Sequence, residues 1–272
     1  MQVSINNEIG IREIRQLTSF VKEKHGVDYS EYALTSFKRR VEGFMSINKY
    51  SMDTLLRKLE SKVFLDHFMG RIAVSDTELF RDPTFWILLK NIYIANIIKE
   101  HSKVKVWLPL CASGEEYYSL VILLRESGWS NCSEIYLSCM SNETLQNIKH
   151  GWLENEKLEI SSKNYSRLQG ASQLSDYFKM TDQEIAFDQS LFANTKFFKG
   201  EFVFDPDLPY MHLILFRNKF IYFTPSLQYK VSAILYNRLT ARGLLATGLM
   251  EEVESSKFTV LNKDESIFQR KN

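Results

Sequence analysis

Strand-like and helix-like segments alternate from Lys103 onward, and this alternation constrains the fold more than any other feature of the sequence. The run VKVWLP leads through a turn of small residues, CASG, into the helix-like EEYYSLVILLRES. A second unit follows as EIYLS and SNETLQNIKHG, and a third strand, HLILF, precedes a helix that Thr224 would cap and Pro225 would start. Strands that alternate with helices predict an α/β fold with a doubly wound, mostly parallel sheet.

The first part of the chain has a different pattern. Between Ile9 and Gly70, apolar residues recur at helical spacing without strand-like alternation. They predict an N-terminal helical domain, residues 1–70, ahead of an α/β domain, residues 71–272. Asp82 is expected to cap, and Pro83 to begin, an apolar helix that runs to about Glu100.

Helical spacing disappears again near the middle of the α/β domain. Three short strand-like runs, YFKM, EIAF and TKFFKG, are separated by polar turns and predict a small antiparallel β insertion over residues 175–200. Farther on, GLLATG, KFTVLN and SIFQR are expected to be strands that close the other edge of the sheet.

The composition limits which binding partners and which cellular compartment we expect. The 272 residues include 34 basic and 33 acidic ones, and a net charge of +1 does not favour nucleic acid as a partner. The N-terminus lacks the pattern of a secretory signal, and the most apolar run, residues 85–98, is interrupted and too short to cross a bilayer. The 3 cysteines form no CxxC pair and the 5 histidines show no ligand spacing, so we expect a cytoplasmic protein without membrane insertion and without a metal.

The loop CASGEE is the first candidate binding element. In an open α/β sheet the ligand lies beyond the carboxyl ends of the strands, where this loop presents backbone amides at a helix start. Gly114 would let the backbone approach a ligand, and Glu115 or Glu116 could bind a cationic amino group. Alone, the loop is compatible with any nucleotide-like ligand, but it is not GxGxxG and no acidic residue ends the second strand, which argues against a generic Rossmann dehydrogenase.

Four segments, read together, resemble the CheR-type chemoreceptor glutamate methyltransferases. They occur in the family's order and spacing across nearly the whole chain and are YALTSFKRRVEGFM, SDTELFRDP, VWLPLCASGEEYYSLVILL and LFRNKFIYFTPSLQ. The resemblance implies a class I, Rossmann-like methyltransferase that transfers a methyl group from S-adenosylmethionine to a glutamate of a chemoreceptor. Since a glutamate carboxylate, with a pKa of about 4.3, is ionised at neutral pH, the transfer would need alignment and desolvation but no general base.

The resemblance also assigns candidate site residues. Thr77 matches a threonine that contacts the cofactor, and Arg81 matches an arginine that lies near both the cofactor and the acceptor. Tyr222 matches a tyrosine beside the position of methyl transfer. Arg81 and Tyr222 are therefore the catalytic candidates. Taken singly, Arg81 is more typical of a solvated surface residue and Tyr222 of a core residue; their joint occurrence in the family's order favours the functional interpretation. The full predicted cofactor-binding set is Thr77, Arg81, Gly114, Glu115, Cys139, Arg217 and Asn218.

A basic run in the helical domain is the candidate contact with the partner. The resemblance places Lys38, Arg39 and Arg40 on a face that meets an acidic receptor helix. A run of three charges is also typical of an ordinary solvated helix surface.

The sequence departs from the family's pattern around the predicted cofactor. Cys139 stands where the family carries an aspartate that holds the ribose hydroxyls, and replacing a carboxylate with a thiol would lower affinity by about tenfold to a hundredfold. Further departures are Leu110, Tyr117, Glu201, His212, Leu249 and Met250, which we expect to cluster around the same pocket. These changes predict a methyltransferase fold with weak or absent S-adenosylmethionine binding.

Two functional classes remain open. One is an active protein-glutamate methyltransferase of a chemotaxis or motility pathway; the other is a non-catalytic protein that uses the same surface to bind a receptor or another signalling protein. In the family the β insertion can dock on the receptor's carboxyl-terminal tail, through an exposed strand edge. Cys111 and Cys139 follow neighbouring strands, so a disulfide between them is the alternative to the free thiols expected in a reducing compartment.

Overall fold

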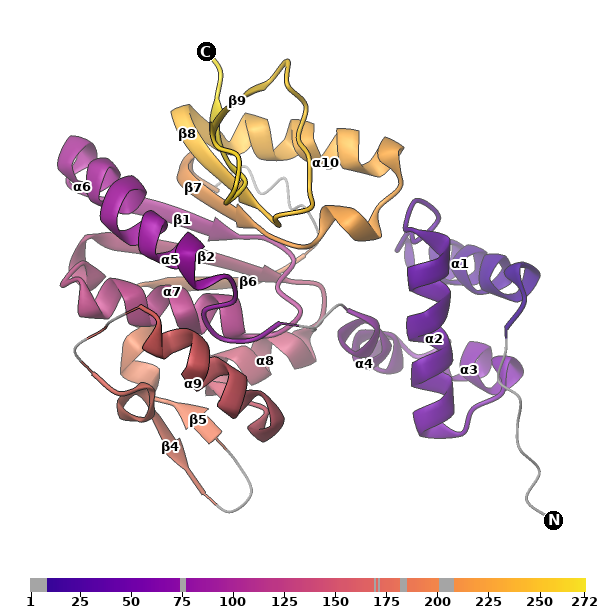
Figure 1. The fold of residues 1–272 in the computed structure, drawn as a ribbon. Coiled ribbons are helices and arrows are strands. Elements are labelled where there is room, and N and C mark those ends of the chain that lie inside the picture. Colours follow the sequence, from indigo (N-terminus) through magenta and orange to yellow (C-terminus); the bar gives the residue numbers. More distant parts are fainter. Residues whose placement is uncertain (1–8, 74–76, 169, 171, 182–184, 201–207) are drawn as a thin grey trace.

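A computed structural model describes residues 9–73, 77–168, 170, 172–181, 185–200 and 208–272. The chain forms a compact helical part at its N-terminus and a larger α/β part built around a sheet (Figure 1). The helical part consists of α1 (Ile11–His25), α2 (Leu34–Asn48), α3 (Met52–Lys58) and α4 (Lys62–Ile72). Its apolar faces meet in a core of their own around Leu17, Val41 and Phe68, as the helical spacing predicted.

The main sheet has seven strands in the order β6-β2-β1-β7-β8-β10-β9. Neighbours from β6 to β8 run parallel, and β10 runs antiparallel to both β8 and β9. The strands are β1 (Val104–Leu108), β2 (Ser133–Cys139), β6 (Thr195–Lys199), β7 (Met211–Phe216), β8 (Leu239–Thr247), β9 (Phe258–Asn262) and β10 (Ile267–Arg270). The predicted α/β fold and the C-terminal edge strands are therefore confirmed.

Helices cover both faces of this sheet. They are α5 (Pro83–Leu88), the π-helical η1 (Leu89–Ile94), α6 (Ala95–His101), α7 (Glu115–Glu126), α8 (Asn142–His150), α9 (Leu158–Ser166) and α10 (Pro225–Arg238). Short 3₁₀ turns are η2 (Ser130–Cys132), η3 (Asn155–Lys157), η4 (Leu174–Tyr177), η5 (Gln189–Phe192) and η6 (Phe220–Tyr222). None of the helices in the described ranges is long and apolar enough to cross a membrane.

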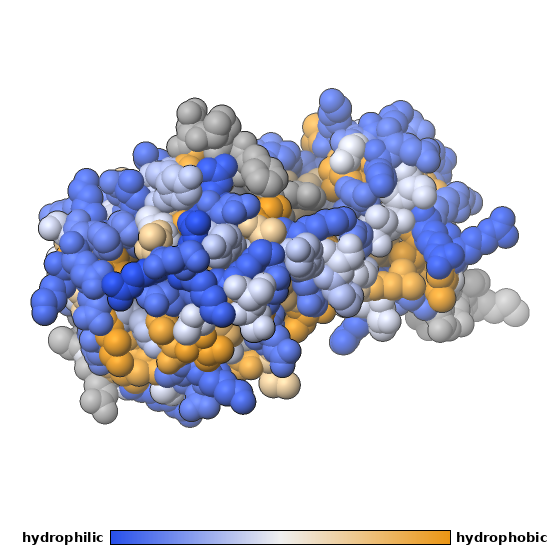
Figure 2. Space-filling view, turned by 90° about the horizontal axis from the view of Figure 1, so that it is seen from above, coloured by the Kyte–Doolittle hydropathy of each residue, from blue (hydrophilic) through white to orange (hydrophobic). Residues whose placement is uncertain are grey.

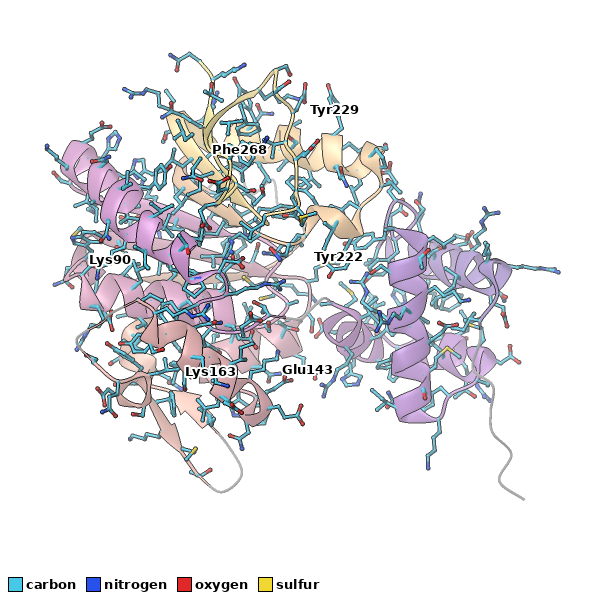
Figure 3. All side chains as sticks on the ribbon, in the orientation of Figure 1. Lys90, Glu143, Lys163, Tyr222, Tyr229 and Phe268 are labelled. Atoms are coloured by element: carbon cyan, nitrogen blue, oxygen red, sulfur yellow. The ribbon has the colours of Figure 1, made fainter. Side chains whose placement is uncertain are left out.

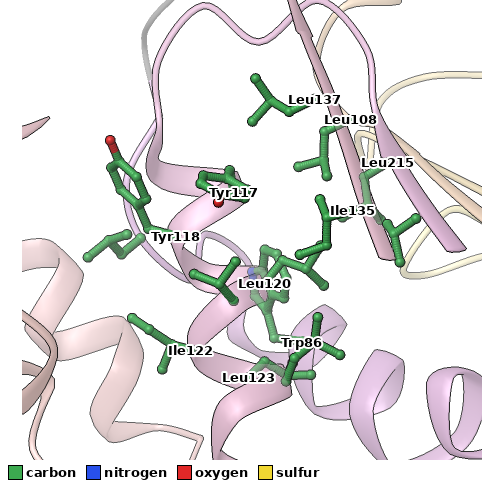
Figure 4. Close-up of a cluster of buried hydrophobic side chains, with 14 of the residues drawn as sticks. Trp86, Leu108, Tyr117, Tyr118, Leu120, Ile122, Leu123, Ile135, Leu137 and Leu215 are labelled. Carbon is green, nitrogen blue, oxygen red and sulfur yellow. The ribbon is translucent and has the colours of Figure 1, made fainter. Parts of the chain in front are cut away.

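The residues of β1 show how the two faces are filled. Val106 and Leu108 belong to a core shared with α7, of which Leu120 and Leu123 are also members. Figure 4 shows Leu108, Leu120 and Leu123 in this core. Trp107, on the opposite face, packs in a second core with side chains of α10. A strand buried on both faces explains why VKVWLP is a continuous apolar run rather than an alternating one.

The β insertion differs from the prediction. A three-stranded antiparallel sheet does form, in the order β3-β5-β4, but its members are β3 (Trp152–Leu153), β4 (Phe178–Met180) and β5 (Ile185–Phe187). The run TKFFKG, which was expected to belong to it, is β6 and pairs in parallel with β2 at the edge of the main sheet. The reason is the adjacent Phe197 and Phe198, which pack against opposite cores and therefore require a sheet that is covered on both faces.

The start of the apolar helix also differs in one respect. Pro83 is the first helical residue, as predicted, whereas Asp82 has a left-handed backbone, with a φ of 57°, and makes no side-chain capping bond. Its carboxylate instead accepts a hydrogen bond of 2.5 Å from Nη2 of Arg217, so a tertiary ion pair replaces the local cap. The predicted cap at Thr224 is confirmed, since its side chain accepts from the backbone N–H of Leu227.

The helical part is held on the α/β part by polar contacts. The carboxylate of Asp66, in α4, accepts hydrogen bonds from the backbone N–H groups of Asn142 and Glu143 at 3.0 and 3.1 Å, and from the hydroxyl of Ser141. Lys199 lies 2.5 Å from the same carboxylate. Asp66 thus caps α8 across the domain boundary and complements the positive end of the helix dipole. Glu143, beside this contact, is marked in Figure 3.

Candidate functional site

The carboxyl ends of β1 and β7 border one cavity, which we call the strand-end crevice. Its volume is about 150 Å³. The lining residues are Thr77, Arg81, Cys111, Ala112, Ser113, Glu116, Arg217, Asn218, Lys219, Ile221 and Tyr222. Thr77, Arg81, Arg217, Asn218 and Tyr222, all singled out in the sequence, therefore meet although up to 145 positions separate them (222 − 77).

Arg217 is the most enclosed cation of the crevice, with a side chain that is 5% exposed. Besides the bond to Asp82, its Nη1 donates to the carbonyl of Arg81 at 3.3 Å, and its guanidinium lies 4.1 Å from the ring centroid of Phe85. Burial lowers the pKa of Arg217, and the neighbouring carboxylates of Glu116 and Asp82 oppose that shift. These contacts fix the segment around Arg81 to the end of β7, so Arg217 positions the crevice wall.

Gly114 and Glu115 lie on the other side of the same loop. They border a larger opening of about 570 Å³, which we call the loop cavity. Glu115, 3% exposed, accepts a bond of 2.9 Å on Oε1 from Lys157, while its Oε2 has no hydrogen-bond partner among the described residues. Glu116 instead faces the crevice, where Lys219 donates to it at 3.3 Å. The two acidic residues of CASGEE therefore serve different cavities.

Cys139 lies beneath the loop and is fully buried. It lines neither the strand-end crevice nor the loop cavity. Burial and the neighbouring Cys111 raise the pKa of Cys139 well above its ordinary value, and burial raises that of Cys111 to about 12. Cys111 and Cys139 are both free thiols. A protonated, enclosed thiol is a poor substitute for a ribose-binding carboxylate.

The departures from the family pattern are not all at one place. Tyr117 fills space behind the loop, packing on Phe192 and Phe197 and sharing a hydrogen bond of 2.8 Å with Thr195. Leu110 lines a third, mostly apolar cavity of about 70 Å³ between the helical part and the loop. Leu249 and Met250 are exposed in the turn after β8, and Glu201 lies outside the described residues.

His212 was expected to lie at the predicted cofactor pocket, and this prediction is wrong. Its ring stacks on that of His101 at 4.6 Å between centroids, and its Nδ1 accepts from the backbone N–H of Lys105. These contacts are at the amino-terminal end of β1 and β7, opposite the crevice. Strand polarity decides this, because a residue that enters a parallel strand and one that leaves it lie at opposite edges of the sheet.

The basic run of α2 does not present one common face. Lys38 pairs with Glu42 at 3.6 Å, and Arg39 is exposed. The guanidinium of Arg40 lies 5.1 Å from the ring centroid of Tyr222, at the junction of the helical part with the crevice. Successive helical residues point about 100° apart, so three adjacent charges cannot share one surface. Figure 3 shows Tyr222 at this junction.

Three functional contacts escaped the sequence analysis. Lys219 reaches Glu116, Lys157 reaches Glu115, and the carboxylate of Glu251 accepts from the backbone N–H groups of Asn218 and Gly248 at 2.8 and 2.6 Å. Only the position of Lys219 directly after LFRN gave a signal. Among the described residues, no group of three or more His, Cys, Asp and Glu side chains could hold a metal ion.

Comparison with known proteins decides the family. A family model described as "CheR methyltransferase, SAM binding domain" matches residues 75–267. The chain belongs to the CheR methyltransferase family. The cofactor of this family domain is S-adenosylmethionine, and the seven-stranded α/β sheet is of the class I methyltransferase type.

Individual relatives are distant but cover nearly the whole chain. "Putative methyltransferase Cher3" of Pseudomonas putida is 27% identical over 95% of this chain and 96% of its own length. A chemotaxis protein methyltransferase of Listeria innocua is 25% identical over 87% of this chain and 88% of its own. Among solved structures, the N-methyltransferase NodS from Bradyrhizobium japonicum, in complex with S-adenosyl-L-homocysteine, aligns with a TM-score of 0.38 and 10% identity over 80% of this chain and 97% of that one.

Proposed function

We propose that this CheR-family protein methylates a glutamate side chain of a signalling protein of the chemoreceptor type, in the cytoplasm, and that it binds S-adenosylmethionine weakly. The observation that carries the proposal is the meeting of Thr77, Arg81, Asn218 and Tyr222 in one crevice beside the loop after β1. These side chains supply the cation and hydroxyl groups that an acceptor carboxylate needs.

The residues around the loop after β1 suit the amino-acid end of S-adenosylmethionine better than its ribose end. At the amino-acid end, Glu115 lines the loop cavity and its buried Oε2 has no hydrogen-bond partner among the described residues, so this carboxylate can accept from an ammonium group. At the ribose end, the enclosed thiol of Cys139 offers no comparable acceptor. When bound, the cofactor supplies an electrophilic methyl group on a cationic sulfur.

The chain's own residues would then do three things. Arg81 would hold the acceptor carboxylate, and the hydroxyl of Tyr222 would fix its orientation at the crevice. Arg217 would keep the Arg81 segment in place through Asp82. No residue needs to remove a proton, because the acceptor is already ionised at neutral pH.

The second candidate is a non-catalytic protein that binds its partner without methylating it. It is favoured by the full burial of Cys139 and by the engagement of both loop glutamates with lysines. On this alternative the helical part and the exposed Arg39 would still contact an acidic helix.

Two measurements test the proposal. The first is calorimetric titration with S-adenosylmethionine and S-adenosylhomocysteine; the second is transfer of a radioactive methyl group to the cytoplasmic fragment of a chemoreceptor. We expect binding weaker than micromolar and slow transfer that Arg81→Ala abolishes. Arg12→Ala, which changes an exposed arginine of α1, is the matched control and should leave transfer unchanged. Cofactor binding without transfer to any receptor fragment favours the second candidate, and micromolar or tighter binding contradicts the weakened site.

A further inference from the structure

Glu115 combines two features that rarely occur together in one carboxylate. It is the first residue of α7 and only 3% exposed, yet one of its oxygens, Oε2, has no hydrogen-bond partner among the described residues. The side chain borders the loop cavity together with Gly114 and Ser113. A buried carboxylate oxygen at the edge of an open cavity indicates an acceptor for a donor that comes from a ligand.

The other oxygen of Glu115 is already engaged by a cation from the same chain. Nζ of Lys157 donates to Oε1 at 2.9 Å, and it lies 3.2 Å from the carboxylate of Glu154. Lys157 is the last residue of η3, so the turn that follows β3, the first strand of the small antiparallel sheet, delivers this lysine to the loop after β1. Its side chain is 20% exposed, whereas that of Glu154 is 69% exposed and well solvated.

The charge of Lys157 is maintained in this position. Burial opposes the charged form, but the charges and hydrogen bonds of Glu115 and Glu154 together outweigh that effect, and the pKa of Lys157 is raised above its ordinary value. At neutral pH the lysine is therefore an ammonium ion. Glu115 and Lys157 together carry no net charge, so the carboxylate offers much less attraction to a second cation than it would alone.

We propose that Lys157 is an internal competitor for the ammonium group of an amino-acid ligand at Glu115, and that it weakens binding at the amino-acid end of the cofactor. This inference rests on the proposed function, because it assumes that a ligand with an α-ammonium group enters the loop cavity. A ligand ammonium on Oε2 would lie beside the lysine ammonium on Oε1, and two cations that share one carboxylate repel each other at close range.

The proposal separates two causes of weak cofactor binding. Replacement of the ribose-binding aspartate by Cys139 affects every ligand that contains adenosine. Competition by Lys157 affects only ligands with an ammonium group. S-adenosylhomocysteine carries that group and 5′-methylthioadenosine lacks it, so this pair of probes separates the contribution of Lys157 from that of Cys139.

The test is calorimetric titration of the full chain with both probes. The variants are Lys157→Met, which removes the charge, and Lys157→Gln, which removes the charge but can still donate a hydrogen bond to Glu115. Lys163→Met is the matched control, because Lys163 pairs with Glu159 on the surface of α9 and is 69% exposed (Figure 3). Thermal unfolding reports whether each variant folds. If Lys157→Met does not fold, the titrations of Lys157→Gln decide the outcome.

We expect removal of the Lys157 charge to tighten S-adenosylhomocysteine binding by about tenfold and to leave 5′-methylthioadenosine binding unchanged. Lys163→Met should change neither. The proposal is overturned if the Lys157 variants bind S-adenosylhomocysteine no more tightly than the unaltered protein does, including the case in which none of the proteins binds it. It is also overturned if both probes tighten equally. Methyl transfer by the unaltered protein, measured separately, decides the proposed function whichever of these results is obtained.

Discussion

In the loop after β1, Gly114 lies so close to the ring of Tyr118 that Gly114→Ala is a demanding test of the fold. A Cβ atom at position 114 would lie 2.2 Å from Cζ and 2.5 Å from the hydroxyl oxygen of Tyr118. The backbone of Gly114, with a φ of −90° and a ψ of −11°, suits alanine. Any loss of stability would therefore come from the clash and not from backbone strain.

Tyr118 cannot move aside easily. The ring is fully buried, stacks on Phe187 at 4.5 Å and on Phe192 at 5.7 Å, and its hydroxyl donates to the carbonyl of Ile148 at 3.1 Å. Overpacking of a buried site typically costs about 1–3 kcal/mol, occasionally more. Because the atom that must move belongs to a ring clamped on two faces, we expect a loss near the upper end, about 3 kcal/mol, in the free energy of unfolding.

The matched control is Gly43→Ala in α2. Gly43 is exposed, and an added Cβ would meet nothing within 4 Å. This substitution should stabilise the protein by about 0.5–1 kcal/mol, because alanine loses less backbone entropy than glycine in a helix. Urea unfolding followed by circular dichroism gives both values. If Gly114→Ala changed the stability by less than about 0.5 kcal/mol, or shifted it in the same direction as Gly43→Ala, the packing described for Tyr118 would be refuted.

Three further outcomes follow from single contacts. Asp66→Ala removes the carboxylate that caps α8 and should lower the free energy of unfolding by about 1–2 kcal/mol in chemical denaturation. Tyr117→Phe removes the buried hydrogen bond to Thr195 and should cost about 1–2 kcal/mol in the same assay; a neutral result would place water at the hydroxyl. Burial, together with His101, lowers the pKa of His212 below 6.5, so its contribution to stability is complete above pH 6.5 and is lost as the pH falls through the lowered pKa. His212→Asn, whose amide oxygen can accept from the same backbone N–H, should therefore reduce the loss of stability between pH 7.5 and about pH 5.5.

The arrangement of cavities gives the loop after β1 a central role. Ala112 borders all three cavities, and Ser113 borders both the strand-end crevice and the loop cavity. A ligand that lies across this loop would touch the N-terminal helices, the crevice and η3 at once. The face of the molecule seen in Figure 2 is mostly hydrophilic, with hydrophobic residues in small groups. The loop is thus the natural place for a ligand to link the two parts of the chain.

The sequence by itself determined the elements and their order. Apolar spacing located the helices of the N-terminal part, and the runs VKVWLP, EIYLS and HLILF located strands, because burial on one or both faces leaves a periodic or continuous apolar pattern in the chain. The resemblance of the four segments to the family also predicted that Thr77, Arg81, Arg217 and Tyr222 belong to one site, and all four line the strand-end crevice.

Only the tertiary structure decided which side chains pair and which face a cavity. Asp82 has the sequence context of a helix cap, but Arg217, 135 positions away, binds its carboxylate. Cys139 stands at a ligand position in the sequence, yet the packing above it closes that position completely. Lys157 lies in a polar turn without any motif, and the fold delivers it to Glu115. Local patterns depend on backbone geometry and burial, whereas ion pairs and cavities depend on contacts between distant segments, and these are fixed only when the whole chain packs.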